Sequence, residues 1–218
     1  MKAVIFDMDG VLFDTERLCL ESWTRLADEQ GLEDMEEVFT RCIGTNHHDT
    51  VEIIKAHYGQ DFPYEEFSAR AGKLFWQWID ENSMPVKKGV RELLDYLKEN
   101  RYLVSLASSS SQRSIERCLD RAGIREYFHQ ITSGDRVVHS KPNPEIYQLA
   151  CDGLGISPKD AYAIEDSYNG IRSAYAAGLQ PIMVPDLIPP NEEMQQMSRV
   201  ILPDLTQVIS YLEQNMGV

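Results

Sequence analysis

The chain begins with a short apolar run that ends in closely spaced aspartates. Residues 3–6 read Ala-Val-Ile-Phe, and Asp7, Asp9 and Asp14 follow them. A carboxylate can act as a nucleophile, as a general acid or base, or as a ligand of a hard cation. A single aspartate after a strand is more often a turn residue or a helix cap. Whether these side chains carry out chemistry therefore depends on what else the fold brings near them.

Polar residues also follow three other segments that are predicted to be strands. Ser108–Ser111 follow residues 102–107, Ser133-Gly134-Asp135 follow residues 130–132, and Glu165 and Asp166 follow residues 161–164. The carboxyl ends of parallel strands lie on one edge of an open sheet, and ligands bind at that edge. We therefore expect these polar groups to meet Asp7 and Asp9 at a single site.

The carboxylates of this predicted site need a positive partner. Asp7, Asp9, Glu165 and Asp166 would repel one another if they came close, and the repulsion would raise some of their pKa values. A hard divalent cation removes the repulsion, and Mg²⁺ binds carboxylate oxygens together with substrate phosphate. Lys141 could add a second positive charge, although an ordinary surface lysine before a helix is the alternative interpretation.

Ser108 stands where a strand turns into a helix. Its hydroxyl group and the backbone N–H groups that follow could bind a phosphate at the helix N-terminus. The alternative is a serine that only caps the helix.

The order of the apolar runs predicts an α/β fold. Nearly continuous apolar runs, which also include residues 181–184 and 199–202, alternate with helical patterns. This alternation is typical of a doubly wound, Rossmann-like parallel sheet. Residues 15–85 exceed what one crossover needs, and they carry helical stripes such as Ala71, Leu74, Phe75 and Trp78. We predict an α/β catalytic core of residues 1–14 and 86–218, and an inserted small α-helical cap domain of residues 15–85.

Composition narrows the classes of function. The chain has 218 residues and a formal net charge of −14, so it should repel nucleic acid. Its four cysteines form no C-x-x-C pair, which favours reduced thiols and a cytoplasmic location. No apolar stretch approaches the roughly 18 residues that span a membrane, and the N-terminal run is too short for a signal peptide. We expect a monomer that binds neither nucleic acid nor membrane.

These motifs together resemble those of the haloacid dehalogenase (HAD) superfamily, in its β-phosphoglucomutase-like phosphatase branch. The resemblance covers essentially the whole chain. It rests on Asp7-Met8-Asp9-Gly10-Val11 with Asp14-Thr15-Glu16, on Ser108 at a strand end, on Lys141-Pro142, and on Glu165-Asp166-Ser167 with Asn169-Gly170-Ile171.

The resemblance implies a role for each residue. Asp7 would be the nucleophile that forms an aspartyl-phosphate, and Asp9 would be the general acid and base. Ser108, Ser109 and Lys141 would hold the phosphoryl oxygens, and Asp14 would be structural. The Mg²⁺ ligands would be Asp7, Asp9 through its backbone carbonyl, Glu165 and Asp166. The expected enzyme is a Mg²⁺-dependent phosphatase of a small phosphorylated metabolite, such as a sugar or polyol phosphate.

Three other functions compete with hydrolysis of a phosphomonoester. A β-phosphoglucomutase would return the phosphoryl group to the sugar. A dehalogenase shares the nucleophilic aspartate, but it needs neither Asp9 nor a metal. A non-enzymatic domain that signals through an aspartyl-phosphate has no need for a cap or for an acid two residues after the nucleophile.

The cap segment bears on the choice between phosphatase and mutase. In the mutase branch an arginine follows a Gly-Val-Ser turn and binds the distal phosphate, whereas this chain reads Gly44-Thr45-Asn46-His47. The mutase pattern also continues Asp-Thr-Ala with a histidine soon after, whereas Glu16 and Cys19 stand at those places. Arg41 or Arg70 could compensate for the missing arginine. His47 and His48 are candidates for substrate selection, with solvated surface histidines as the alternative.

Overall fold

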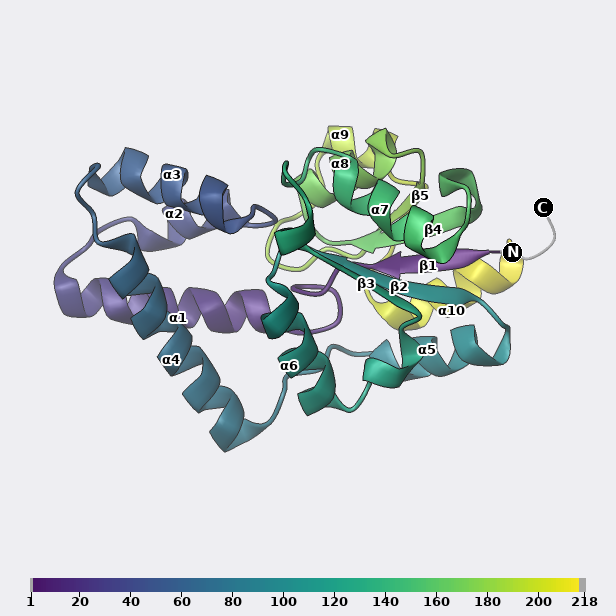
Figure 1. Ribbon diagram of the computed structural model, residues 1–218, viewed down its shortest axis with the longest axis horizontal. Helices are drawn as coiled ribbons and strands as arrows, with labels where there is room; N and C mark the ends of the chain where they lie inside the picture. The colour runs from purple at the N-terminus through teal and green to yellow at the C-terminus, as the bar shows by residue number, and fades with distance from the viewer. Residues whose placement is uncertain (1, 216–218) are drawn as a thin grey trace.

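A parallel sheet with helices on both faces forms the larger part of the molecule (Figure 1). In this computed structural model, which describes residues 2–215, the sheet has six strands in the order β3-β2-β1-β4-β5-β6. The strands are β1 (Ala3–Phe6), β2 (Leu103–Ser108), β3 (Gln130–Ser133), β4 (Ala161–Glu165), β5 (Gln180–Met183) and β6 (Val200–Ile201). Every neighbouring pair is parallel. The predicted doubly wound α/β fold is therefore confirmed.

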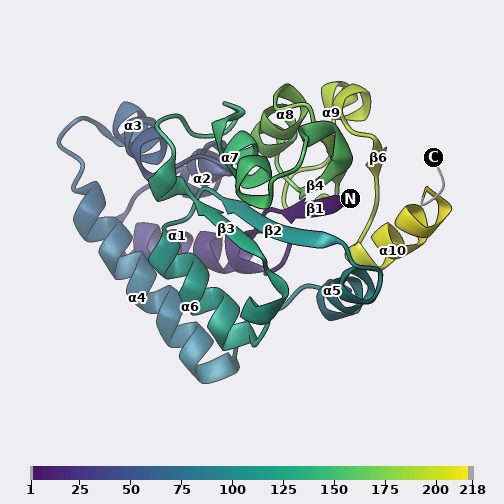
Figure 2. The same cartoon turned by 45° about the vertical axis from the view of Figure 1, so that its right-hand side comes forward.

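Helices cover both faces of the sheet, which explains why its strands are apolar on both sides (Figure 2). Val4 and Phe6 face one hydrophobic cluster, while Ala3 and Ile5 face another. The first cluster includes residues of α5 (Val90–Glu99), α6 (Gln112–Ala122) and α10 (Leu205–Gln214). The second includes residues of α7 (Glu145–Leu154) and α8 (Tyr168–Ala176), and α9 (Glu192–Met197) packs beside α8. Short 3₁₀ turns occupy Arg125–Tyr127, Gly134–Arg136 and Pro158–Asp160.

Four helices lie between β1 and α5 and form a group of their own at the carboxyl end of the sheet (Figure 1). They are α1 (Thr15–Gln30), α2 (Met35–Cys42), α3 (His47–Tyr58) and α4 (Tyr64–Asn82). Trp23, Phe39 and Phe67 are among the buried residues of their separate hydrophobic cluster. This group is the predicted helical cap.

The buried stripe of α4 differs from the predicted one. Ala71 and Phe75 are buried as expected, but Trp78 is 38% exposed and Ile79 is buried instead. The buried residues therefore advance in steps of four along α4, a spacing that keeps residues on one face of a helix. The predicted packing role of Trp78 is wrong.

The two segments that join the cap to the core run side by side. The backbone N–H of Asp14 donates to the Pro85 carbonyl at 2.9 Å, and that of Lys87 donates to the Leu12 carbonyl at 2.9 Å. The chain therefore leaves and re-enters the core at one place, just beyond Asp7. The division of the chain at residues 15 and 85 into two domains stays a prediction. Among the helices in residues 2–215, none has the length and apolar character needed to cross a bilayer.

Candidate active site

The predicted site residues follow strands at the point where the strand order reverses. From β1 the chain builds outward through β2 and β3, then returns to the other side of β1 with β4. Asp7 follows β1 directly, and its backbone N–H donates to the Ile164 carbonyl of β4 at 2.9 Å. Asp166 follows β4. This crevice is where doubly wound sheets bind their ligands.

Lys141 is a buried cation between two of the carboxylates. Its side chain lies in the segment before α7 and is only 2% exposed. The Nζ atom lies 2.6 Å from Asp7 Oδ1 and 2.6 Å from Glu165 Oε1, and it also donates to the Ala107 carbonyl at 3.1 Å. Both carboxylates raise the pKa of Lys141, which overcomes the opposite effect of its burial. Lys141 is therefore a charged residue of the site and not a surface lysine.

Glu165 is fully buried and held on several sides. Besides Lys141, the hydroxyl group of Tyr147 donates to its Oε1 at 2.7 Å, and that of Ser167 donates to its Oε2 at 3.2 Å. Gly170 leaves the space for this carboxylate, because a Cβ atom there would overlap it. Tyr147 was not predicted as a site residue, because its only signal in the sequence is an aromatic residue among the apolar positions of a helix.

Two hydroxyl groups hold the carboxyl group of Asp9. The hydroxyl group of Thr15 donates to its Oδ1 at 2.5 Å, and that of Ser110 donates to its Oδ2 at 3.0 Å. Burial raises the pKa of Asp9, while the two hydrogen bonds and the charge of Lys141 act in the opposite direction. A carboxyl group with a raised pKa is suited to donate a proton. The serine turn was expected to meet Asp9, and Ser110 does so, but the role of Thr15 as a donor to Asp9 was not predicted.

The serines after β2 have different partners. Ser108 is buried, and its oxygen accepts from the backbone N–H of Ser110 at 3.1 Å. The hydroxyl group of Ser109 donates to the Gly44 carbonyl of the cap at 3.3 Å. Ser111, and not Ser108, is the residue whose side chain caps α6. Phosphate binding by Ser108 and Ser109 stays a prediction.

The carboxylates also form a group with the spacing of a cation site. Oxygens of Asp7, Glu165 and Asp166 lie within 4.8 Å of one another, and all three residues are buried. Burial and the neighbouring acids raise the pKa of Asp7 to about 8, against the opposing effect of Lys141, and they raise that of Asp166 well above its usual value. Gly10, at a φ of 78°, makes room here, because a Cβ atom would overlap the Asp166 carboxylate. This set of buried oxygen donors fits a hard divalent cation.

A second group of acids shares Asp166. Its oxygens, with those of Glu16 and Asp186, lie within 4.8 Å of one another. Glu16 Oε2 and Asp186 Oδ2 are buried and have no hydrogen-bond partner, although Lys87 pairs with the other oxygen of Asp186. Glu16 and Asp186 therefore add two carboxyl groups beside the candidate cation site. Neither was predicted as a metal ligand.

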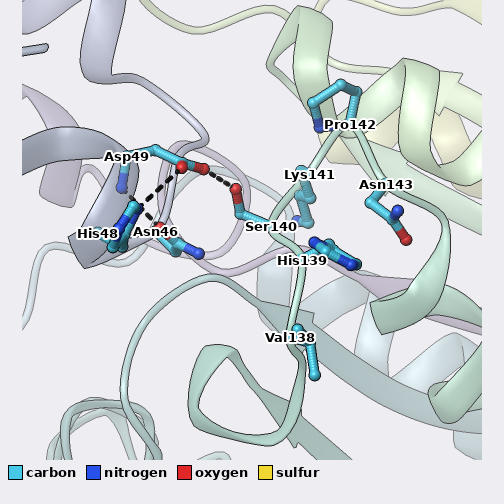
Figure 3. A pocket seen from close by; sticks show the side chains of 9 residues that line it. All are labelled: Asn46, His48, Asp49, Val138, His139, Ser140, Lys141, Pro142 and Asn143. Atoms are coloured by element: carbon cyan, nitrogen blue, oxygen red, sulfur yellow. Dashed lines mark hydrogen bonds and ion pairs between the residues drawn. The ribbon is translucent and has the colours of Figure 1, made fainter. Parts of the chain in front are cut away.

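A cavity of about 420 Å³ opens over Asp7 and Asp9, between the serine turn and the cap. His47 lines this cavity, although its side chain is 64% exposed, and its part in substrate selection stays a prediction. His48 does not line the cavity, and it lies beside a different hollow of about 660 Å³ with Ser140 and Lys141 (Figure 3). There Asp49 points at Ser140 and accepts its hydroxyl hydrogen bond, which joins α3 to the segment before α7 (Figure 3).

Comparison with known proteins identifies the family. A model described as haloacid dehalogenase-like hydrolase matches residues 4–184, which contain β2 to β5, most of β1 and every predicted site residue. The chain belongs to the haloacid dehalogenase-like hydrolase family.

Similar proteins cover nearly the full length of this HAD-family chain. A phosphorylated carbohydrates phosphatase of Thermotoga maritima is 35% identical over 186 residues, which are 84% of each protein. The β-phosphoglucomutase of Bacillus subtilis is 31% identical over 205 residues, covering 86% of this chain and 88% of that one. The crystal structure of CbbY from Rhodobacter sphaeroides with phosphate superposes with a TM-score of 0.80 at 26% identity, covering 95% and 96% of the two chains.

Proposed function

We propose that the protein is a Mg²⁺-dependent phosphomonoesterase that acts on a small phosphorylated metabolite, such as a sugar or polyol phosphate, through an aspartyl-phosphate. The observation that carries the proposal is the different setting of the two aspartates. Asp7 lies against the ammonium group of Lys141, whereas Asp9 lies between two hydroxyl groups. The charge of Lys141 favours the ionised form of Asp7 against the effect of its burial, whereas the two hydroxyl groups place Asp9 to exchange a proton.

In the first half of the reaction, a carboxylate oxygen of Asp7 attacks phosphorus and the bond to the leaving alcohol breaks. Asp9, in its protonated form, gives its proton to the departing oxygen. Lys141 bonds Asp7 Oδ1, so the other oxygen of Asp7 is the one free to attack. In the second half, a water molecule gives a proton to Asp9 and attacks the phosphorus, and the bond between phosphorus and the Asp7 oxygen breaks, which releases phosphate. Asp7 and Asp9 then return to their starting protonation states.

Asp7, Glu165 and Asp166 would hold the cation, together with the backbone carbonyl of Asp9. When bound, Mg²⁺ supplies positive charge that keeps Asp7 ionised and stabilises the phosphoryl oxygens. Ser108, Ser109 and Lys141 are proposed to orient those oxygens. The raised pKa values of Asp7 and Asp166 support a cation here, because both groups would otherwise tend to bind protons.

The relative named a β-phosphoglucomutase keeps mutase action as the second candidate. Two features of this chain favour hydrolysis. The Gly44–His47 segment carries no arginine. Arg41 and Arg70, the proposed substitutes, are exposed and do not line the cavity, and Arg70 pairs with Glu29. A cytoplasmic location and a monomeric state remain predictions.

The test is release of inorganic phosphate from p-nitrophenyl phosphate and from a panel of sugar and polyol phosphates. We expect turnover with Mg²⁺, loss of turnover with EDTA, and recovery when Mg²⁺ is restored. Full activity in EDTA would refute the metal requirement. Absence of hydrolysis across the panel in the presence of Mg²⁺ would refute the proposed function.

A further inference from the structure

The residues that line the cavity over Asp7 fall into two groups. Those at its floor take part in the proposed reaction, whereas those on the wall formed by the cap do not. The floor includes Asp7, Asp9 and Ser108. The wall lies on the cap, where the alcohol part of a phosphomonoester bound to Asp7 must lie, because the cap faces the carboxyl end of the sheet (Figure 1). The side chains of this wall therefore indicate which kind of leaving group the cavity can bind.

Aromatic rings make the deeper part of this wall. The ring of Trp23 packs edge-on against Phe39 at 5.3 Å and against Tyr64 at 6.2 Å between centroids. All three residues line the cavity and are otherwise buried in the cap. Cys42 lines it beside them. Such a surface favours the C–H faces of a carbon skeleton over a charged group.

Apart from Glu16 and His47, the polar side chains of the wall are uncharged. Four hydroxyl-bearing residues line the cavity, namely Thr45, Thr50 and Ser68 of the cap and Ser114 of α6. Hydroxyl groups donate and accept hydrogen bonds, so they suit the hydroxyl groups of a polyol or sugar. Burial raises the pKa of Cys42 and of Tyr64 to about 12, so the thiol and the phenol also remain neutral.

Positive charge is missing from the cavity lining. Among residues 2–215, neither a lysine nor an arginine is part of that lining, whereas Asp7, Asp9 and Glu16 are. His47, which also lines the cavity, already pairs with Glu65 of α4 at 3.1 Å. A second anionic group on the substrate would therefore lose its hydration without gaining an ion pair with a lysine or arginine of the lining. It would also lie near three carboxylates. Burial of an unpaired charge is strongly unfavourable.

We propose that the cap-side wall is a binding site for an uncharged, hydroxyl-bearing leaving group, so that the enzyme selects monophosphates of neutral polyols or sugars against bisphosphates and carboxylated phosphates. This inference rests on the proposed phosphatase function and narrows its substrate class. The size of the cavity agrees with it. A volume of about 420 Å³ is at the small end of the roughly 300–1,000 Å³ typical of ligand sites.

The experiment compares substrates that match in size but differ in charge. Sorbitol 6-phosphate and 6-phosphogluconate differ only in whether the far end is a hydroxymethyl group or a carboxylate. Fructose 6-phosphate and fructose 1,6-bisphosphate differ by one phosphate. We expect kcat/KM for the neutral member to exceed that for the charged member by at least about tenfold in each pair, a ratio equivalent to about 1.4 kcal/mol. Equal or reversed values in either pair would overturn the inference.

A pair of variants tests whether charge is the cause. Ser68→Arg places a cation on the wall, and Ser68→Gln adds a similar side chain without charge. We expect the arginine variant to shift the preference toward fructose 1,6-bisphosphate by at least about fivefold relative to the glutamine variant, as new pairing with phosphate implies. The same preference in both variants would overturn the charge argument.

The failure of this inference can be told apart from failure of the proposed function. If the enzyme hydrolyses p-nitrophenyl phosphate and does not discriminate within the pairs, the phosphatase assignment stands and the neutral-leaving-group site is refuted. If neither p-nitrophenyl phosphate nor any member of the pairs is hydrolysed with Mg²⁺, the proposed function itself is refuted, and the inference falls with it.

Discussion

The hydroxyl group of Thr15 donates to the Asp9 carboxylate at 2.5 Å. Thr15 is the first residue of α1, the helix that begins the cap, and Asp9 belongs to the loop after β1. The orientation of the proposed general acid and base is therefore set in part by where the cap begins. A movement of α1 relative to the core would change this hydrogen bond.

Replacement of Thr15 tests this coupling. Thr15→Val removes the hydroxyl group at nearly constant volume, and we expect kcat/KM for an alkyl phosphate to fall by about 10- to 100-fold, as for loss of a hydrogen bond to a charged group. The loss should be smaller for p-nitrophenyl phosphate, because nitrophenolate leaves without protonation. Thr15→Ser, the matched control, should retain most of the activity. Equal losses with both substrates would show that Thr15 does not act through Asp9.

Asp7→Asn tests the covalent mechanism. An amide cannot form the aspartyl-phosphate, so we expect kcat to fall by about 10⁴-fold or more. The wild-type enzyme, quenched in acid during turnover, should carry one phosphoryl group on the peptide that contains Asp7, as measured by mass spectrometry. Substantial hydrolysis by the variant, or a phosphoryl group on another residue, would contradict the mechanism.

Much of the fold was predictable because its signals are local. Short strands that are buried on both faces favour apolar residues at nearly every position, and residues 3–6 and 161–164 show this plainly. The first motif indicated the family because Asp7 and Asp9 lie only two residues apart, within one short stretch of sequence. Trp78 was misplaced because its spacing from Ala71 and Phe75 also fits a helical stripe, and only packing against other elements decides which side is buried.

The supporting contacts of the site were not predictable in the same way. Lys141 lies 134 residues from Asp7, and Ser110 lies 101 residues from Asp9. Contacts at such separations depend on how helices and loops pack, and an isolated sequence contains no periodic signal for them. Lys141 was a candidate from the sequence, and the resemblance gave it a role, but the contacts of Thr15, Tyr147 and Glu16 emerged only from the packed structure.

Two glycine replacements should have opposite effects on stability. Gly170 of α8 packs against Glu165, which Lys141 and Tyr147 hold in place, so the new methyl group of Gly170→Ala cannot be accommodated without displacement. We expect the free energy of unfolding to fall by about 1–3 kcal/mol, as for overpacking of a core. A methyl group added at Gly72 of α4 would meet no atom within 4 Å, so Gly72→Ala should raise the free energy of unfolding by about 0.5–1 kcal/mol.

Urea unfolding followed by circular dichroism measures both effects, provided that the slope of the transition is unchanged. A Gly170→Ala protein as stable as the wild type would show that the Glu165 carboxylate moves readily. A loss of stability in Gly72→Ala would contradict the open space beside α4.

Asp166→Ala tests the proposed cation site. Asp166 belongs to both acidic groups and makes no ion pair with Lys141, so its removal should weaken cation binding more directly than it disturbs the lysine. We expect a Mg²⁺ concentration for half-maximal activity at least about tenfold higher than in the wild type, in line with loss of a ligand. Asp186→Asn, which alters only the second group, serves as the comparison. An unchanged Mg²⁺ titration of Asp166→Ala would exclude Asp166 as a ligand.

The final prediction is that hydrolysis exceeds mutase action. A mutase must hold a sugar bisphosphate while it turns over, and this requires a cation for the distal phosphate. Among residues 2–215, the cavity lining contains no arginine or lysine, and Arg41 and Arg70 are exposed. We therefore expect that β-glucose 1-phosphate, supplied with Mg²⁺ and a trace of glucose 1,6-bisphosphate, gives free phosphate and little glucose 6-phosphate. Both products are followed together by coupled assays. Stoichiometric glucose 6-phosphate with little free phosphate would assign the mutase instead, and Arg41→Ala would then show whether that arginine reaches the distal phosphate.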